Sequence, residues 1–239
     1  MNLNLVSGGA AHGLVARLTD QFHATTGFRI APVFGAVGAM KDALVAGAPA
    51  DLVILTAEAI ADLATAGLVA RDTIVDIGAV HTGIAIRTGD PAPPINDTAT
   101  LREALHEADA IYFPDPARAT AGIHFEKILR QLDTTGALTN RIRTFPNGAA
   151  AMTAMAAHVG GRPIGCTQVT EILGTAGVTL VANLPREVEL VTIYTAAVAN
   201  RARHPVEARR LAELLAGPSA HRDRETAGFG AAARQPMNP

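Results

Sequence analysis

The chain begins with the same pattern twice: a short apolar strand, a glycine-rich turn and a helical run. The first copy places Ser7–Gly13 after Leu3–Val6, and the second places Gly35–Met40 after Phe28–Phe34. Each turn brings the N-terminus of a helix, with its free backbone N–H groups, to the carboxyl end of a strand. Two such ends that converge on one crevice bind an anion without a basic side chain. The alternative is that the glycines only permit tight turns between strand and helix.

The rest of the sequence continues this alternation and predicts an α/β fold. Apolar runs such as Leu52–Leu55 show no polar alternation, which is typical of buried parallel strands. Helical segments separate the runs, and this order predicts right-handed crossovers. Ile74–Ile77 and Gly83–Arg87 are expected to form two separate strands. Neither glycine-rich turn matches the Walker or the dinucleotide-binding pattern, so a nucleotide is not the expected ligand.

The order of these segments predicts two lobes. Three strand–helix units precede residue 82, and the turn-rich, proline-rich stretch Arg87–Pro94 follows it. A second series runs to about residue 192, where the long apolar strand Leu190–Ala199 leads into two closing helices. We expect one lobe of residues 1–82 plus 194–239 and another of residues 83–193. The ligand site is expected in the cleft between them.

Composition excludes several classes of partner. The 239 residues are 18% charged with a net charge of −2, which gives no electrostatic footprint for nucleic acid. The single cysteine excludes an internal disulfide and any site built from several cysteines. No apolar run approaches the ~20 residues that a membrane span needs. His12, His81 and His124 do not form a metal-ligand spacing, so neither a metal nor another cofactor is expected.

The start of the chain bears on its compartment. Met1–Val6 is too short and too uncharged for a secretory leader, and a strand begins at once. We therefore expect a cytoplasmic protein for the chain as written. A chain whose leader has been replaced by Met1 would read the same way, and that protein would be periplasmic.

Several motifs resemble one family along nearly the whole chain. They are Gly47–Ile54, close to the segment AGAPADL; Pro114–Pro116 with Thr120–Ile123, close to GDP…PAG; Gly165–Glu171; and Gly217–Ser219 with Gly228–Phe229, close to GP…GF. Their order and spacing are similar to those of molybdate-type solute-binding proteins. The resemblance implies a type II periplasmic-binding fold, with two α/β lobes, two hinge strands and a ligand clamped between the lobes. It also implies an ABC permease as partner if the protein is exported.

The chain departs from that family where the ligand is held. The family's first two loops carry serines, whereas here Ser7 is followed by two glycines and Gly35–Ala39 has no hydroxyl group. The tyrosine of the family's fourth loop is replaced by Thr167 or Gln168. The chain therefore has fewer oxyanion donors and more free volume, which favours a di- or tricarboxylate over molybdate.

Three further segments resemble a branch of this fold that includes aconitate isomerase. They are Phe34–Met40 (FGAVGAM), Ala119–Phe125 (ATAGIHF) and Gly165–Glu171 (GCTQVTE). As an alternative to binding alone, this resemblance implies a cytoplasmic isomerase. Such an enzyme moves a double bond between cis- and trans-aconitate by allylic proton transfer.

The candidate ligand-binding residues lie mainly at four helix or loop starts and offer N–H groups, hydroxyls and amides. They are Ser7, Gly8, Gly9, Ala10, Ala36, Val37, Gly38, Arg118, Thr120, Ala121, Gly122, Asn147, Thr167 and Gln168. Thr120 is the expected N-cap of a helix whose N–H groups at Ala121 and Gly122 face a carboxylate. Asn147 can donate to the ligand, and a plain turn is the alternative reading.

Arg118 and Lys41 are the basic side chains best placed to meet a polyanion, and Arg87 is a weaker candidate. For each of them, a solvated charge is the alternative.

The candidate catalytic residues apply only if the protein is an enzyme. His124 lies in the first turn of its expected helix, where the helix N-terminus favours the neutral imidazole that suits a general base. Thr167 or Glu171 would assist it. The alternatives are a histidine that packs or caps, and a Glu171 that stabilises the first turn of a short helix. Cys166 is expected to be a small buried hydrophobic residue.

Overall fold

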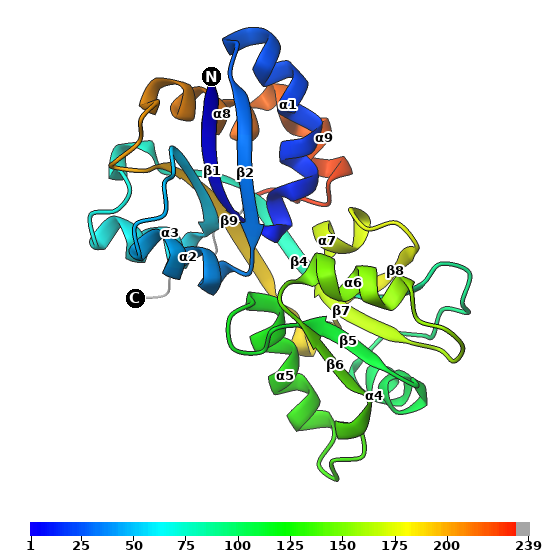
Figure 1. Ribbon diagram of the computed structural model, residues 1–239. Helices are drawn as coiled ribbons and strands as arrows, with labels where there is room; N and C mark the ends of the chain where they lie inside the picture. The colour runs from blue at the N-terminus through cyan, green and yellow to red at the C-terminus, as the bar shows by residue number, and fades with distance from the viewer. Residues whose placement is uncertain (233–239) are drawn as a thin grey trace. The chain divides into compact units, whose positions relative to one another are not determined.

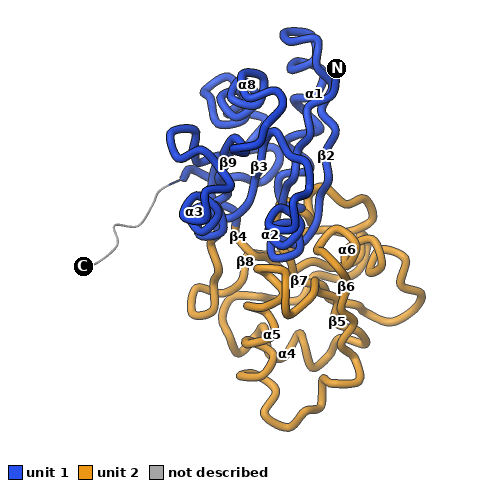
Figure 2. The backbone as a smooth tube through the Cα atoms, turned by 60° about the vertical axis from the view of Figure 1, so that its left-hand side comes forward, with its two compact units in different colours: residues 1–80, 192–239 blue, residues 81–191 orange. Residues whose placement is uncertain are grey.

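The computed structural model describes residues 1–232. The chain divides into two compact units, unit 1 of Met1–Val80 with Thr192–Pro239 and unit 2 of His81–Val191 (Figure 2). It leaves unit 1 inside strand β4 (Val75–Arg87) and returns at the start of strand β9 (Val191–Val198). The sequence predicts these crossings at residues 82 and 193, and residues 233–239 of the predicted first lobe lie outside the described residues. The cleft that it expects between the lobes stays a prediction.

Unit 1 is an α/β sheet with helices on both faces, which confirms the predicted class. Its strands β1 (Asn2–Gly8), β2 (Arg29–Gly35), β3 (Leu52–Thr56) and β9 lie in the order β2-β1-β3-β9. The first three are parallel, and β9 runs antiparallel to β3. The helices are η1 (Gly9–Ala11), α1 (His12–Thr26), α2 (Val37–Val45), α3 (Ala57–Thr65), η2 (Arg71–Thr73), α8 (Pro205–Ala216), η5 (Pro218–Ala220) and α9 (His221–Thr226) (Figure 1).

The core of unit 1 follows from the two-residue period of its strands. In β1, Leu3 and Leu5 face a cluster formed with α1 and α8, whereas Val6 faces a cluster formed with α2 and α3. In β3, Ile54 and Val53 divide between the same two clusters. Both faces of β1 and β3 are therefore buried, as their apolar runs predict, whereas β2 at the edge of the sheet has no buried residue.

Unit 2 repeats the architecture with a different strand order. Strands β5 (Ile111–Pro114), β6 (Ile142–Phe145), β7 (Ile164–Gln168) and β8 (Val178–Asn183) join β4 in the order β4-β7-β5-β6, and β8 also pairs with β4. The strands β7, β5 and β6 are parallel, and β4 runs antiparallel to β7 and β8. The helices are α4 (Thr98–Glu107), α5 (Thr120–Leu132), η3 (Thr139–Arg141), α6 (Gly148–Ala156), α7 (Val169–Leu173) and η4 (Arg186–Val188).

Two apolar clusters define the faces of this second sheet. Ile84 and Cys166 pack with α4 and α5, whereas Ala85 packs with α6 and α7. Because side chains alternate along a strand, Gln168 lies on the α5 face of β7 and Thr167 on its α6 face. At the end of β7, an amide side chain therefore lies on the α5 face and a hydroxyl group on the α6 face.

One sequence-based expectation about the strands is wrong. Ile74–Ile77 and Gly83–Arg87 are not separate strands, because β4 runs without a break from Val75 to Arg87. A glycine such as Gly78 favours the end of a strand, but here it allows β4 to pack closely against Gly230. A Cβ built on it would lie 2.8 Å from the carbonyl oxygen of Gly230.

Candidate functional site

In unit 1, three helices begin at the carboxyl edge of the parallel strands. The register places Gly8 beside Gly35, so the turns after β1 and β2 are neighbours. The hydroxyl oxygen of Thr56 accepts a hydrogen bond from the N–H of Ala59 at 3.2 Å, which caps α3. Neither Gly8, before η1, nor Ala36, before α2, supplies a side-chain cap. Two of the three helix starts therefore keep N–H groups that no side-chain cap uses.

The predicted binding residues of unit 1 lie at these two starts. Gly9 and Ala10 belong to η1, and Val37 and Gly38 are the first residues of α2. Ser7 is fully buried, and its hydroxyl donates to the carbonyl oxygen of Gly8 at 2.9 Å. The structure brings these residues to one edge, and their role in ligand binding stays a prediction.

In unit 2, α5 begins at the end of the central parallel strand β5. The N-cap is Ala119 and Thr120 is the first helical residue, so the prediction of Thr120 as the cap is wrong. Ala119 supplies no side-chain cap. A Cβ built on Gly122 would overlap the carbonyl oxygens of Pro114 and Asp115. The first turn of α5 therefore lies directly against the end of β5, and only glycine permits this approach.

The start of α6 is capped more completely. The side-chain oxygen of Asn147 accepts a hydrogen bond from the N–H of Ala150 at 2.9 Å. The carboxylate of Glu171 accepts hydrogen bonds from the N–H groups of Gly148 and Ala149. The first three N–H groups of α6 thus all have acceptors within the protein. Asn147 is therefore the N-cap of α6, a structural role, as in the alternative reading of a plain turn.

Glu171 and Thr167, predicted as alternative partners of His124, are in direct contact with each other. The Thr167 hydroxyl donates to Oε2 of Glu171 at 2.6 Å, and both residues are buried. Glu171 lies in the first turn of α7, as predicted. Burial raises the pKa of the Glu171 carboxyl above its ordinary value of 4.5. Hydrogen bonds from Thr167 and from the N–H groups of Ala149, Gly148 and Gln168 oppose this rise in pKa.

The raised pKa of Glu171 predicts a pH dependence of stability. A carboxyl with a higher pKa in the folded state contributes stability that is fully present below the unfolded pKa. This contribution is lost as pH rises through the folded pKa. We expect Glu171→Gln to remove this loss, so that the variant gains stability relative to the wild type as pH rises above 4.5. Urea unfolding across a pH series measures the difference, and parallel profiles would contradict the expectation.

His124 is anchored elsewhere. Its Nε2 lies 2.8 Å from the carbonyl oxygen of Val188, so a proton on Nε2 makes the ring a donor to η4. His124 is also the fifth residue of α5, which corrects its expected place in the first turn. The structure therefore supports the alternative of a packed, anchored histidine. A catalytic role for His124 stays a prediction.

The other candidate side chains have ordinary structural roles. Lys41 forms an ion pair with Asp62, and Arg87 forms one with Asp90 at 2.9 Å. Arg118 is exposed in the loop before α5. Cys166 is buried, and burial raises the pKa of its thiol well above the ordinary value. A thiolate is disfavoured there, which agrees with the expected hydrophobic role.

Thr82, beside the carboxyl end of β7, was not among the residues predicted for the site. Thr82 is 1% exposed, and its hydroxyl oxygen has no hydrogen-bond partner among the described residues. In the pairing of β4 with β7 it lies opposite Gln168, at the carboxyl end of β7. It shares a strand face with Ile84, which packs in the cluster that includes α5. A threonine in a strand is common and does not by itself indicate a functional site. Only the strand register shows that Thr82 lies opposite Gln168.

The unpartnered hydroxyl of Thr82 leads to a stability prediction. Replacing it with valine keeps the shape and removes a buried polar group, so we expect the free energy of unfolding to rise by about 1 kcal/mol. Thr73→Val is the matched control, because the Thr73 hydroxyl donates to the carbonyl of Ala70 and accepts from the N–H of Val198. The control should lose stability. Urea unfolding compares the variants, and a similar loss in Thr82→Val would contradict the assignment.

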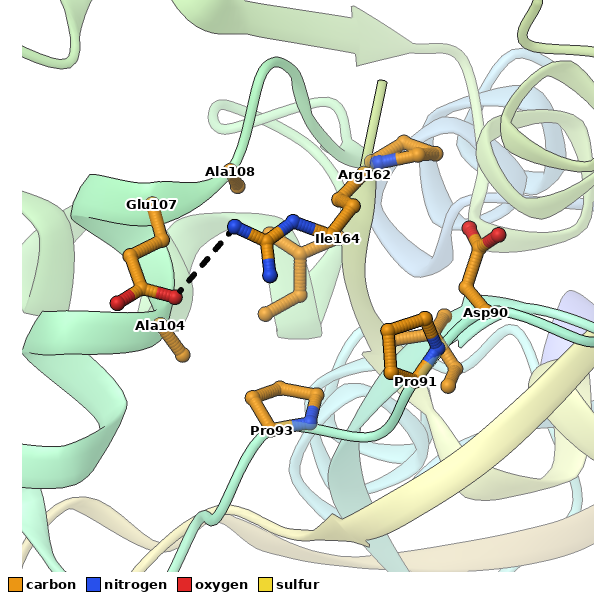
Figure 3. A pocket seen from close by; sticks show the side chains of 10 residues that line it. Asp90, Pro91, Pro93, Ala104, Glu107, Ala108, Arg162 and Ile164 are labelled. Atoms are coloured by element: carbon orange, nitrogen blue, oxygen red, sulfur yellow. Dashed lines mark ion pairs between the residues drawn. The ribbon is translucent and has the colours of Figure 1, made fainter. Parts of the chain in front are cut away.

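A small hollow in unit 2 lies at the opposite edge of the sheet. It is lined by the end of β4 and the start of β7, where Ile86 pairs with Ile164, and by the end of α4. Figure 3 shows the Arg162 guanidinium directed at the Glu107 carboxylate, 3.8 Å away. The volume of about 40 Å³ suits water-sized groups and is far below that of a ligand pocket. The hollow is therefore too small for a di- or tricarboxylate.

Residues 1–232 contain neither a candidate metal cluster nor a membrane-spanning helix. No three side chains of His, Cys, Asp or Glu gather there as a metal site requires. No helix in that part of the chain has the length and hydrophobicity to cross a bilayer.

The sequence is similar to those of known proteins. The family model described as bacterial extracellular solute-binding protein matches residues 3–230. An aconitate isomerase from a Pseudomonas species is 28% identical over 242 residues, which cover 98% of this chain and 89% of that protein.

Solved structures share the fold. The periplasmic molybdate-binding protein of Azotobacter vinelandii matches with a TM-score of 0.79 at 17% identity, over 97% of this chain and 100% of that one. A sulfate-binding protein of Mycobacterium tuberculosis matches with a TM-score of 0.75 at 20% identity, over 97% of this chain and 87% of that one. At these identities the likeness bears on the fold alone.

Proposed function

We propose that this chain, which belongs to the family of bacterial extracellular solute-binding proteins, binds a small organic anion with two or three carboxylates. The family match confirms the resemblance that the motifs indicate. The observation that carries the ligand proposal is the set of helix starts without side-chain caps. Among the helices that follow parallel strands, these are the starts of α5 and α7 in unit 2 and the starts of η1 and α2 in unit 1. Such starts attract negative charge through N–H groups and the helix dipole.

The chemistry of these starts favours carboxylates over tetrahedral oxyanions. The hydroxyl of Ser7 already donates to the carbonyl of Gly8, and the start of α2 carries only Ala36, Val37 and Gly38. Few hydroxyl donors therefore accompany the backbone N–H groups. A flat carboxylate needs fewer convergent donors than a four-oxygen anion, and small side chains leave room for its carbon skeleton. The relative that acts on aconitate, a tricarboxylate, supports the same class of ligand.

A thermal unfolding series tests this proposal. The purified chain is heated with cis-aconitate, tricarballylate, malonate, sulfate or molybdate at matched ionic strength. A ligand at a hundred times its Kd adds about 2.7 kcal/mol to the free energy of unfolding, which raises Tm by roughly 5–10 °C in a chain of this size. We expect the tricarboxylates to give the largest rise. A flat series, or a rise with inorganic anions alone, would refute the proposal.

The isomerase of aconitate is a second candidate, favoured by the relative that matches 98% of this chain. In this reaction a base removes a proton from the methylene carbon of cis-aconitate, the double bond shifts, and a proton returns to the former vinyl carbon. The buried carboxyl of Glu171, with its raised pKa and its hydrogen bond from Thr167, suits the proton transfer better than the anchored His124.

Proton NMR of cis-aconitate in D₂O tests the second candidate. Turnover would produce the trans isomer and incorporate deuterium at the carbon that receives the proton. Glu171→Gln should then lower the rate about a hundredfold or more, whereas His124→Ala should have the smaller effect. Absence of any trans isomer with the wild-type protein would remove the isomerase from consideration.

The two candidates differ in compartment and partner. A transport role requires export to the periplasm and an ABC permease that receives the ligand, and the isomerase requires neither. Fractionation of native cells separates them: periplasmic protein supports transport, and cytoplasmic protein supports the enzyme.

A further inference from the structure

We propose that Glu171 sets the ligand selectivity of unit 2 by holding its own carboxylate at the anion position of helix α6. This inference rests on the proposed function, because it concerns which anions that function admits. Of the two helices of nine or more residues that follow the parallel strands of unit 2, α5 after β5 has no side-chain cap, whereas the start of α6 after β6 is capped by Asn147 and Glu171. The chain thus fills one helix start itself and leaves the other to a ligand.

The carboxylate of Glu171 makes the contacts that a bound anion would make. The N–H groups of Gly148 and Ala149, the first two residues of α6, donate to it. The N–H of Gln168 and the hydroxyl of Thr167 donate as well, the latter at 2.6 Å. Backbone N–H groups at a helix start, together with one hydroxyl, form the donor set typical of an anion site. Glu171 is only 8% exposed, so its carboxylate is held by the protein and not by solvent.

Gly148 shows that this arrangement is built into the fold. A Cβ on Gly148 would overlap both Oε2 of Glu171 and Oγ1 of Thr167. The first residue of α6 must therefore lack a side chain for the carboxylate to reach the N–H groups. Contact between α6 and α7 keeps the two elements in place.

This internal carboxylate discriminates between classes of ligand. At the start of α6, an inorganic dianion such as sulfate or molybdate would have to displace the Glu171 carboxylate or bind beside its negative charge. Both are unfavourable. A carboxylate bound at the start of α5 does not require the N–H groups of α6. The selectivity therefore comes from exclusion of oxyanions as well as from contacts to the carboxylate ligand.

Removal of the carboxylate should open the position to external anions. In Glu171→Ala we expect formate to raise Tm in a saturable manner, and sulfate or molybdate to bind about tenfold more tightly than to the wild type. At equal ionic strength the wild type should show a smaller rise with formate, because the start of α6 is already occupied and only open starts such as that of α5 accept it. Glu103→Ala is the matched control, because it removes an exposed carboxylate of α4 with the same change in net charge.

The outcomes separate this inference from the proposed function. A folded Glu171→Ala variant without a response to formate, sulfate or molybdate would overturn the inference, even if the wild type binds carboxylates. If the alanine variant does not fold, Glu171→Gln takes its place, and unchanged sulfate affinity in it would overturn the inference equally. If the wild type binds no carboxylate, the proposed function fails, and this inference fails with it.

Discussion

Replacing Asp51 with alanine is expected to lower the free energy of unfolding by about 2–4 kcal/mol. Asp51 is 1% exposed, and its carboxylate accepts three backbone hydrogen bonds. One comes from the N–H of Asn4 at 2.8 Å, and the others from Arg203 at 2.7 Å and His204 at 2.9 Å. Each partly buried N–H group left without an acceptor costs about 1–3 kcal/mol, so the loss accumulates over three groups.

The position of Asp51 explains why this loss is large. The residue precedes β3 and joins β1 to the segment that enters α8, so its removal loosens three parts of unit 1 together. Asp62→Ala is the control, because its side chain is 57% exposed and its ion pair with Lys41 should contribute less than about 1 kcal/mol. Urea unfolding of both variants measures the difference. Equal small losses would contradict the role assigned to Asp51.

Gly122→Ala is expected to have the second largest effect, on stability and on ligand binding together. The added methyl group would overlap two backbone carbonyl oxygens, those of Pro114 and Asp115, which cannot move aside as a flexible side chain can. The first turn of α5 must therefore shift away from β5. We expect a loss of about 2–3 kcal/mol in the free energy of unfolding. We also expect the affinity for cis-aconitate to fall about tenfold, because a misplaced set of N–H groups binds less well.

A second helical glycine provides the control for this variant. A Cβ on Gly13, in the first turn of α1, would lie 4.0 Å from the Cβ of Ala227, which is ordinary contact. Gly13→Ala should therefore be neutral or stabilise the protein by up to about 1 kcal/mol, since alanine favours a helix. Urea unfolding and isothermal titration calorimetry compare the two. If both variants behave like the wild type, the close approach of α5 to β5 has no energetic weight.

Much of the fold was predictable because local signals agree with the architecture. Apolar runs without alternation predicted buried strands, and glycine-rich turns predicted helix starts at their carboxyl ends. The exception at β4 arose because Gly78 is needed for packing against Gly230, a residue far away in the sequence. A glycine required by a distant partner cannot be told from one that ends a strand.

The site was predictable only where its partners are close in sequence. The contact of Thr167 with Glu171, four residues apart, is of this kind, whereas His124, which was predicted to act with one of them, lies against Val188. The contact of Glu171 with the start of α6 depends on how two helices pack, which no local pattern shows. For the same reason Asp51 was read as part of a family motif, since its partners Arg203 and His204 lie more than a hundred residues away. Thr82 required the strand register to be recognised.

Amide chemical shifts measured during a titration with cis-aconitate test most directly which helix start binds the ligand. In ¹⁵N-labelled protein, the account predicts that the largest changes in unit 2 occur at Thr120, Ala121 and Gly122. Gly148 and Ala149 should change little, because Glu171 already accepts their hydrogen bonds. The largest changes at Gly148 and Ala149, or beside the hollow at Ala108, with none at the start of α5, would contradict the account.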